Sequence, residues 1–146
     1  VLLNTKLPIL IIPEDVEMQI PQKIGFATDY EAFNRSAMFW TEALAACFDS
    51  ELVVLHINDK QMALTNNQEV CYRQIWSEVG QYEKATMRMT AGQHFLADIQ
   101  KKIEEYHIDL LTMVTQRGHV SNANYLDSIS INIAKNPKIP TLIFHY

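Results

Sequence analysis

Apolar runs of strand length alternate with longer segments whose apolar residues have helical spacing, and this alternation constrains the fold more than any other feature. Runs that are apolar throughout are typical of strands buried on both faces, as in parallel sheets. Parallel strands need long crossovers, which helices supply. The sequence therefore predicts an α/β fold with a doubly wound, mainly parallel sheet. The predicted strands are Lys23–Asp29, Glu51–Ile57, Tyr82–Thr90, Ile108–Val114 and Thr141–Tyr146.

Helices are predicted between these strands, with their apolar residues facing the sheet. The first has Ala37, Trp40, Leu44 and Cys47, and the second has Val70, Ile75, Trp76 and Val79 before Gly80. The third has Phe95, Leu96, Ile99, Ile103 and Tyr106. The fourth has Leu126, Ile129, Ile133 and Ala134 and stops before Pro137.

Length and composition predict one globular domain, because 146 residues with 48% hydrophobic content can bury a sizeable core. The net charge of −5 argues against nucleic acid and anionic membranes as partners. No apolar run is long enough to span a bilayer. Cys47 and Cys71 lack metal-binding spacing, so we expect buried thiols in a reducing compartment, the cytoplasm.

A short sequence near the start of the chain is repeated near its end. "KLPILII" at Lys6–Ile12 matches "KIPTLIF" at Lys138–Phe144, with lysine, proline, leucine and isoleucine in one register. The match predicts that residues 1–22 are the last strand and linker of a preceding copy of the domain, and that residues 23–146 form the domain itself. Chance similarity between two apolar strands is the alternative.

The segment "KIGFATDYEAFNRSAMFWTEALAACFDSELVVLHI" resembles the opening strand, helix and second strand of the universal stress protein family. "IDLLTMV" and "KIPTLIF" resemble its fourth and fifth strands. The resemblance implies the Usp-like, adenine nucleotide alpha hydrolase-like fold: a five-stranded parallel sheet in the order 3-2-1-4-5, with helices on both faces. It also implies that two domains pair through the last strand, in a dimer or within a tandem chain.

Nucleotide-binding members of this family carry a glycine-rich loop after the fourth strand. Aligning "MVTQRGHVSNANYLDS" with that loop puts Val114, Arg117 and Asp127 at its three glycine positions, and only Ser128 matches. A β-branched residue resists the positive φ and close backbone approach that a phosphate loop needs. Asp127 would repel a phosphate at the start of the next helix, or it simply caps that helix. The usual ATP site is therefore expected to be lost.

Other anion-binding groups remain, so the resemblance still implies a candidate ligand site. Its residues are Thr28, Asp29, His56, Met113, Val114, Arg117 and Ser128. Asp29 corresponds to the aspartate that ends the family's first strand, or it caps the following helix. Arg117 and His119 offer positive charge to an anion. A nucleotide or small-anion binder with an altered loop, with ATP and magnesium as cofactor, is thus the alternative function.

The last strand carries three apolar side chains at what we expect to be a sheet edge: Leu142, Phe144 and Tyr146. An apolar, unpaired edge favours strand addition. We expect a homodimer through this edge, pairing with the N-terminal "PILII" strand of a sister domain, or a swap of that strand between chains.

Taken together, these features predict a non-enzymatic stress-response domain with no cofactor and no metal. Five histidines lack metal-binding spacing with one another or with cysteine. A hydrolase would need a framed nucleophile; Ser128 with His119, or His56 as the base, is the remaining combination.

Overall fold

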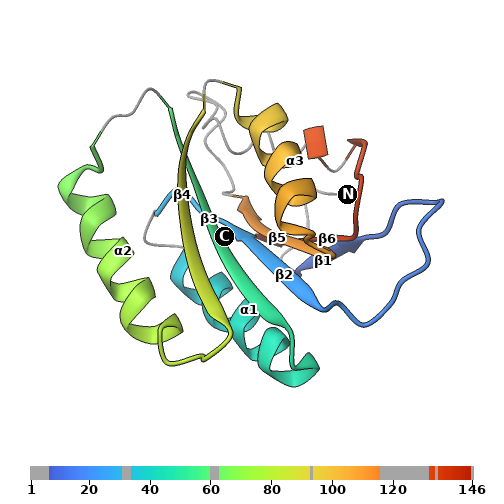
Figure 1. Ribbon diagram of the computed structural model, residues 1–146, viewed down its shortest axis with the longest axis horizontal. Helices are drawn as coiled ribbons and strands as arrows, with labels where there is room; N and C mark the ends of the chain where they lie inside the picture. The colour runs from blue at the N-terminus through green and yellow to red at the C-terminus, as the bar shows by residue number, and fades with distance from the viewer. Residues whose placement is uncertain are drawn as a thin grey trace.

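The computed structural model describes residues 7–30, 34–59, 63–92, 94–115, 132–133 and 135–145. They form a six-stranded sheet in the order β1-β6-β5-β2-β3-β4 with helices on its faces (Figure 1). The strands are β1 (Ile9–Ile11), β2 (Lys23–Ala27), β3 (Glu51–Asp59), β4 (Ala85–Gly92), β5 (Leu110–Thr115) and β6 (Thr141–His145). The helices are α1 (Asn34–Phe48), α2 (Asn66–Val79) and α3 (Phe95–Tyr106).

The five strands predicted from the alternation are all present and parallel. β2 lies between β3 and β5, β4 pairs with the outer side of β3, and β6 pairs with β5. In the numbering of the predicted strands this is the order 3-2-1-4-5, which confirms the doubly wound α/β fold. The switch in direction of winding lies at β2, so its carboxyl end is where such sheets hold ligands.

The sheet differs from the predicted one by a sixth strand. β1 pairs antiparallel with β6 of the same chain, with Leu10 opposite Leu142. The sheet is thus mostly parallel with one strand more than the five that the resemblance implies, and β1 covers the apolar edge of β6. The sequence left open whether the N-terminal strand pairs with β6 of its own chain or of another chain, and in the structure it pairs within the chain.

The two faces of the sheet bury separate cores. α1 and α2 pack on one face, where residues such as Phe26, Leu52 and Ile75 form the core. α3 packs on the other face, where Leu55, Ile99 and Leu111 form the core. The buried residues Leu52 to Ile57 alternate between the two cores, as expected for a central parallel strand.

Two predicted helix faces need correction. In α1, Trp40 is 60% exposed and Cys47 is also exposed, while Ala37 and Ala45 are fully buried. In α2, Val70 and Trp76 are exposed and Cys71 is buried. Ala37 in α1 and Ile75 and Val79 in α2 are buried as predicted. The predicted burial of Trp40, Val70 and Trp76 and of the Cys47 thiol is wrong, because both helices carry apolar residues beyond the buried stripe and spacing alone does not choose among them.

The last predicted helix lies largely outside the described residues, which include neither Leu126, Ile129 nor Ala134. Ile133 is described, is helical and is buried in the core on the α3 face.

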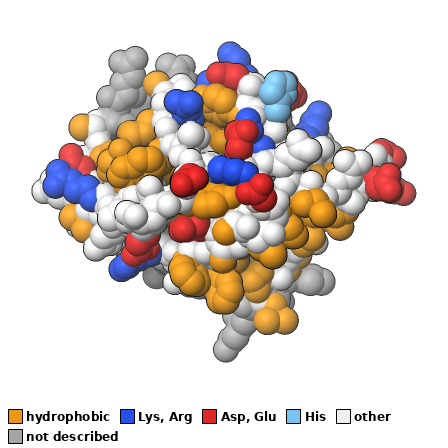
Figure 2. Space-filling view, turned by 60° about the horizontal axis from the view of Figure 1, so that its bottom comes forward, with side chains coloured by type: hydrophobic (Ala, Val, Ile, Leu, Met, Phe, Trp, Pro, Cys, Tyr) orange, Lys and Arg blue, Asp and Glu red, His pale blue; other side chains and the backbone are white. Residues whose placement is uncertain are grey.

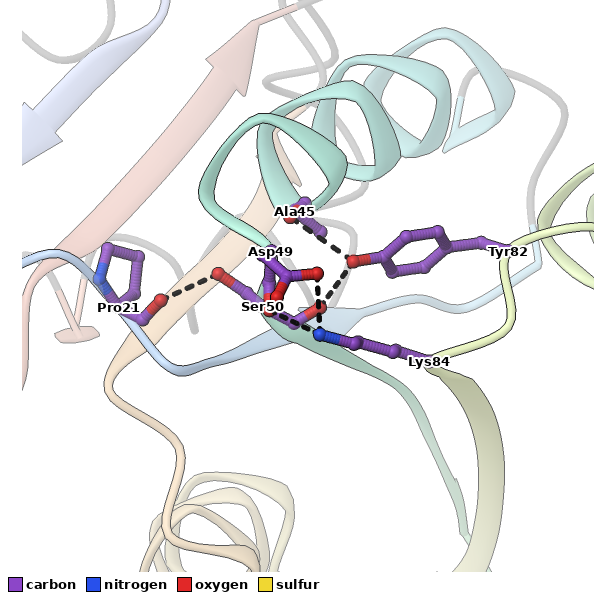
Figure 3. A network of polar contacts seen from close by, with 6 residues as sticks. All are labelled: Pro21, Ala45, Asp49, Ser50, Tyr82 and Lys84. Atoms are coloured by element: carbon purple, nitrogen blue, oxygen red, sulfur yellow. Dashed lines mark hydrogen bonds and ion pairs between the residues drawn. The ribbon is translucent and has the colours of Figure 1, made fainter.

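A polar network joins the amino ends of the central strands (Figure 3). The Ser50 hydroxyl donates to the carbonyl oxygen of Pro21 at 2.6 Å, and the Tyr82 hydroxyl donates to that of Ser50 at 2.6 Å. Lys84 forms an ion pair with Asp49 and also donates to its carbonyl oxygen. Asp49 has φ 58°, a left-handed conformation that ends α1 and that aspartate tolerates. The network therefore fixes the turn from α1 into β3.

Candidate functional site

The candidate site begins at the carboxyl ends of β2 and β3, where the backbone leaves the sheet. Thr28 directly follows β2 and is 1% exposed. Its N–H donates to the carbonyl oxygen of Leu55 at 2.9 Å, and its hydroxyl accepts from the N–H of Tyr30 at 2.9 Å. The hydrogen bonds of Thr28 thus stabilise the turn that contains Asp29. The side chain of Asp29 is only partly buried.

His56 lies in β3 beside this turn, as the sequence predicted. Its Nδ1–H donates to the carbonyl oxygen of Thr28 at 2.8 Å, which leaves Nε2 without a proton in the neutral ring. The side chain is 5% exposed. Burial lowers the pKa of His56, and the hydrogen bond to Thr28 and the charge of Asp29 oppose this shift. His56 is therefore placed to remain neutral at pH 7.

Tyr30 covers the ring of His56. The two rings stack with centroids 4.3 Å apart, and Tyr72 of α2 packs edge-on against Tyr30. Tyr30 is 1% exposed and has φ 60°, a conformation uncommon for a bulky residue. Its hydroxyl is buried and has no hydrogen-bond partner among the described residues, and burial raises its pKa. A protein side chain therefore fills the space over His56.

Gln68 ties α2 to the same turn. Its side-chain Nε2 donates to the carbonyl oxygen of Asp29 at 3.1 Å. Its Oε1 accepts from the N–H of Thr65 at 3.0 Å, while the Thr65 hydroxyl accepts from the N–H of Gln68. This is a capping box, which satisfies the free N–H groups at the start of α2. The first turn of α2 is thus fixed against the end of β2.

Met113 and Val114, the candidates from β5, point to opposite faces of the sheet. Met113 is buried in the core on the α3 face, and Val114 in the core on the α1 face. Val114 is a strand residue paired with Phe144, so the position aligned with the family's first loop glycine lies within the β5–β6 ladder. Both side chains act as core residues here.

Three other candidates lie outside the described residues: Arg117, Ser128 and Tyr146. Asp127 and His119 lie there as well. The structure therefore brings together Thr28, Asp29 and His56 from the predicted ligand site. Of the predicted interface residues, Leu142 faces Leu10 of β1 in register, and Phe144 is buried in the core.

Three residues of this region are absent from the sequence-based prediction: Tyr30, Gln68 and Tyr72. The spacing Thr65-x-x-Gln68 is a capping-box signal that the sequence contains. Nothing local to Tyr30 or Tyr72 shows that their rings meet over His56, because they come from different elements.

Within the described ranges, no three His, Cys, Asp or Glu side chains are grouped so that they could hold a metal ion. Among the described helices none is both long and apolar enough to cross a membrane.

Comparison with known proteins gives matches by structure only. No protein family model and no curated protein matches the sequence. A universal stress protein in complex with cAMP superposes with a TM-score of 0.62 at 19% identity, over 86% of this chain and 97% of its own. UspA from Lactobacillus plantarum gives 0.64 at 13% identity, over 84% and 97%.

A universal stress protein from Archaeoglobus fulgidus matches over almost the entire chain. The TM-score is 0.71 at 16% identity, and the match covers 99% of this chain but 51% of that protein. The chain thus spans about half the length of that relative. Since each of these neighbours shares the parallel α/β architecture, the chain has the fold of the universal stress proteins.

Proposed function

We propose that this chain is a universal stress protein-like domain of a stress response. It acts by pairing with a sister domain or with a second copy of itself. It does not turn over ATP, and it does not bind ATP in the family's usual way. The burial of Tyr30 over His56 at the carboxyl end of the sheet carries the ATP part of the proposal. That position is where open α/β sheets hold their ligands.

The polar groups there are already used by the protein. The Thr28 carbonyl accepts from His56, the Thr28 hydroxyl accepts from Tyr30, and the Asp29 carbonyl accepts from Gln68. A base that entered this space would have to displace the Tyr30 ring and its contacts with His56 and Tyr72. Displacing a fully buried aromatic side chain costs on the order of 3 kcal/mol, which weakens any ligand by about two decades.

A nucleotide or small-anion binder with an altered loop is the second candidate. It is favoured by the neighbour that is described in complex with cAMP. It is also favoured by the carboxylate of Asp29, which is partly exposed beside the turn. In this case Asp29, Arg117 and Ser128 would contact the ligand.

Equilibrium dialysis of the chain against ATP with magnesium, and separately against cAMP, distinguishes the two candidates. We expect dissociation constants weaker than about 10 micromolar for both, which corresponds to roughly −7 kcal/mol. Tighter binding of either nucleotide, lost in Asp29→Ala, would favour the second candidate. Release of ADP or phosphate would overturn the non-enzymatic part.

The pairing part rests on the register of β1 with β6. Leu10 and Leu142 hold the same place in the two matching sequences, and they lie opposite each other in the antiparallel ladder. On either side of this pair, Ile9 faces Ile143 and Ile11 faces Thr141. The two equivalent strands are thus related by a local two-fold axis through the leucine pair, which is the geometry of an isologous contact.

This symmetry supports β1 as the last strand of a preceding sister domain. The match to the Archaeoglobus fulgidus protein over 99% of this chain and half of that protein supports the same arrangement. On this proposal, β1 marks the seam of a tandem pair.

A further inference from the structure

An open groove of about 790 Å³ lies between α1 and α2, away from the candidate ligand site. Most of its lining comes from α1, and Glu78 comes from α2. The lining residues are Arg35, Ser36, Phe39, Trp40, Glu42, Ala43, Ala46 and Glu78.

Two large aromatic side chains form one wall and are mostly exposed. Phe39 is 61% exposed and Trp40 is 60% exposed, and their rings pack edge to face with centroids 5.6 Å apart. The small side chains of Ala43 and Ala46 leave the helix backbone approachable. The view that brings the lower side of Figure 1 forward shows broad hydrophobic patches beside acidic side chains (Figure 2). Adjacent exposed aromatics of this kind mark interaction surfaces.

The groove has more acidic than basic side chains among its lining residues. Arg35 forms a salt bridge with Glu78, which uses the positive charge of the groove. Glu42 is partly buried, and no described Lys, Arg or His side chain lies within ion-pair distance of it. Burial, with the neighbouring Glu78, raises the pKa of Glu42. One carboxylate thus lines the same groove as Phe39 and Trp40 and has no ion-pair partner among the described residues.

We propose that this groove binds a basic, amphipathic segment of a partner protein. A lysine or arginine of the segment would pair with Glu42, and the apolar part of the segment would cover Trp40. Apolar side chains one helical turn away on the segment would pack on Phe39 and over Ala43 and Ala46. The negative charge of the groove matches the basic residues of the segment, and its apolar wall matches the apolar residues of the segment.

The groove does not depend on the pairing or ATP proposals. Its lining residues belong to α1 and α2 and none belongs to β1 or β6, which lie apart from α2 in Figure 1. The segment therefore finds the groove free when β1 and β6 are paired, and failure of one proposal leaves the other standing.

The probe is a short synthetic peptide of leucine and lysine at helical spacing, without aromatic residues. The chain has two tryptophans, so Trp76→Phe leaves Trp40 as the fluorescent reporter. We expect the emission of Trp40 to shift to shorter wavelength as the peptide is added. Glu42→Gln should weaken binding about fivefold, the upper range for an accessible ion pair. Phe39→Ala should weaken it by about tenfold.

Two matched variants test whether the groove itself is responsible. Glu104→Gln removes the same charge from the exposed side of α3, and Val70→Ser removes an exposed apolar side chain of α2 that does not line the groove. We expect neither to change the affinity, and we expect a peptide with glutamate in place of lysine not to bind.

Several results would overturn the proposal. Equal weakening by Glu42→Gln and Glu104→Gln would show general charge attraction. Equal binding of the glutamate peptide would show a purely apolar contact. Sedimentation that shows self-association of the chain, abolished by Phe39→Ala, would make a second copy the occupant. Because Glu42→Gln alters a partly exposed residue, it tests the proposal even if Phe39→Ala destabilises the fold.

Discussion

Two tyrosines place their hydroxyl groups in opposite situations. The Tyr30 hydroxyl is buried without a partner among the described residues. The Tyr82 hydroxyl donates to the carbonyl oxygen of Ser50 at 2.6 Å, within the network that fixes the turn into β3. A buried polar group without a hydrogen-bond partner lowers the stability of the fold, whereas a buried group with a partner adds to it.

We therefore expect the two Tyr→Phe substitutions to change the stability in opposite directions. Tyr30→Phe should raise the free energy of unfolding by about 1 kcal/mol, and Tyr82→Phe should lower it by about 1 kcal/mol. Urea denaturation followed by circular dichroism measures both, and each variant is the other's control because the chemical change is identical. A loss of stability in Tyr30→Phe would mean that its hydroxyl has a partner in the native protein.

His56 makes stability depend on pH. Its pKa is lowered in the folded protein from the ordinary value of 6.5, chiefly by burial. Below pH 6.5 the unfolded chain takes up the proton first, so protonation favours unfolding. This contribution is fully present above pH 6.5, and it is lost as pH falls from there through the lowered folded-state pKa.

We expect the free energy of unfolding to fall between pH 7.5 and pH 5.5, and to fall less in His56→Asn. Asparagine cannot titrate, and its amide can still donate to the Thr28 carbonyl. The control is His107→Asn, which removes an exposed histidine from a left-handed position that asparagine tolerates. Urea titrations at the two pH values measure the difference. An unchanged slope in His56→Asn would contradict the assignment.

At the scale of elements, β1 decides whether β6 is an inner strand or an edge strand of the sheet. Without it, β6 would present unpaired N–H and C=O groups next to the half-buried Leu142. Such an edge recruits another strand. We expect deletion of residues 1–12 to increase self-association relative to the whole chain, as measured by analytical ultracentrifugation.

The control for this deletion is Leu10→Ala, which keeps the backbone pairing of β1 while removing an exposed side chain. It should associate no more than the whole chain. If the deletion variant also stays unassociated at the same concentration, the edge of β6 is protected by something other than β1.

The elements themselves were predictable because their signals are local. The run at Leu52–Leu55 is apolar throughout, and a strand buried on both faces follows from that alone. The stripe of α3 likewise follows from spacing, and Ile99 and Ile103 are buried as expected. In α1 the predicted stripe holds both Ala37 and Trp40, yet Ala37 is fully buried and Trp40 is 60% exposed, so spacing alone did not identify the buried side.

At the scale of the whole molecule, three surfaces are separate. The β1–β6 edge lies at one side of the sheet, the groove is lined by α1 and α2, and the Tyr30–His56 pair lies at the carboxyl end. Pairing through the edge therefore leaves the groove accessible. On the two proposals, the domain would combine a pairing edge with a second contact surface.

The sequence by itself determined the α/β class and the doubly wound sheet, because apolar period is a local signal and crossover handedness admits few topologies. The order of the strands followed from the resemblance to the universal stress proteins and not from the apolar pattern. Only the tertiary structure decided that β1 covers the edge of β6, that Trp40 faces outward and that Tyr30 lies over His56. Each of these depends on contacts between residues far apart in the chain. Which side chains are buried, and which strand edges and polar groups are paired, is determined only when the elements pack together.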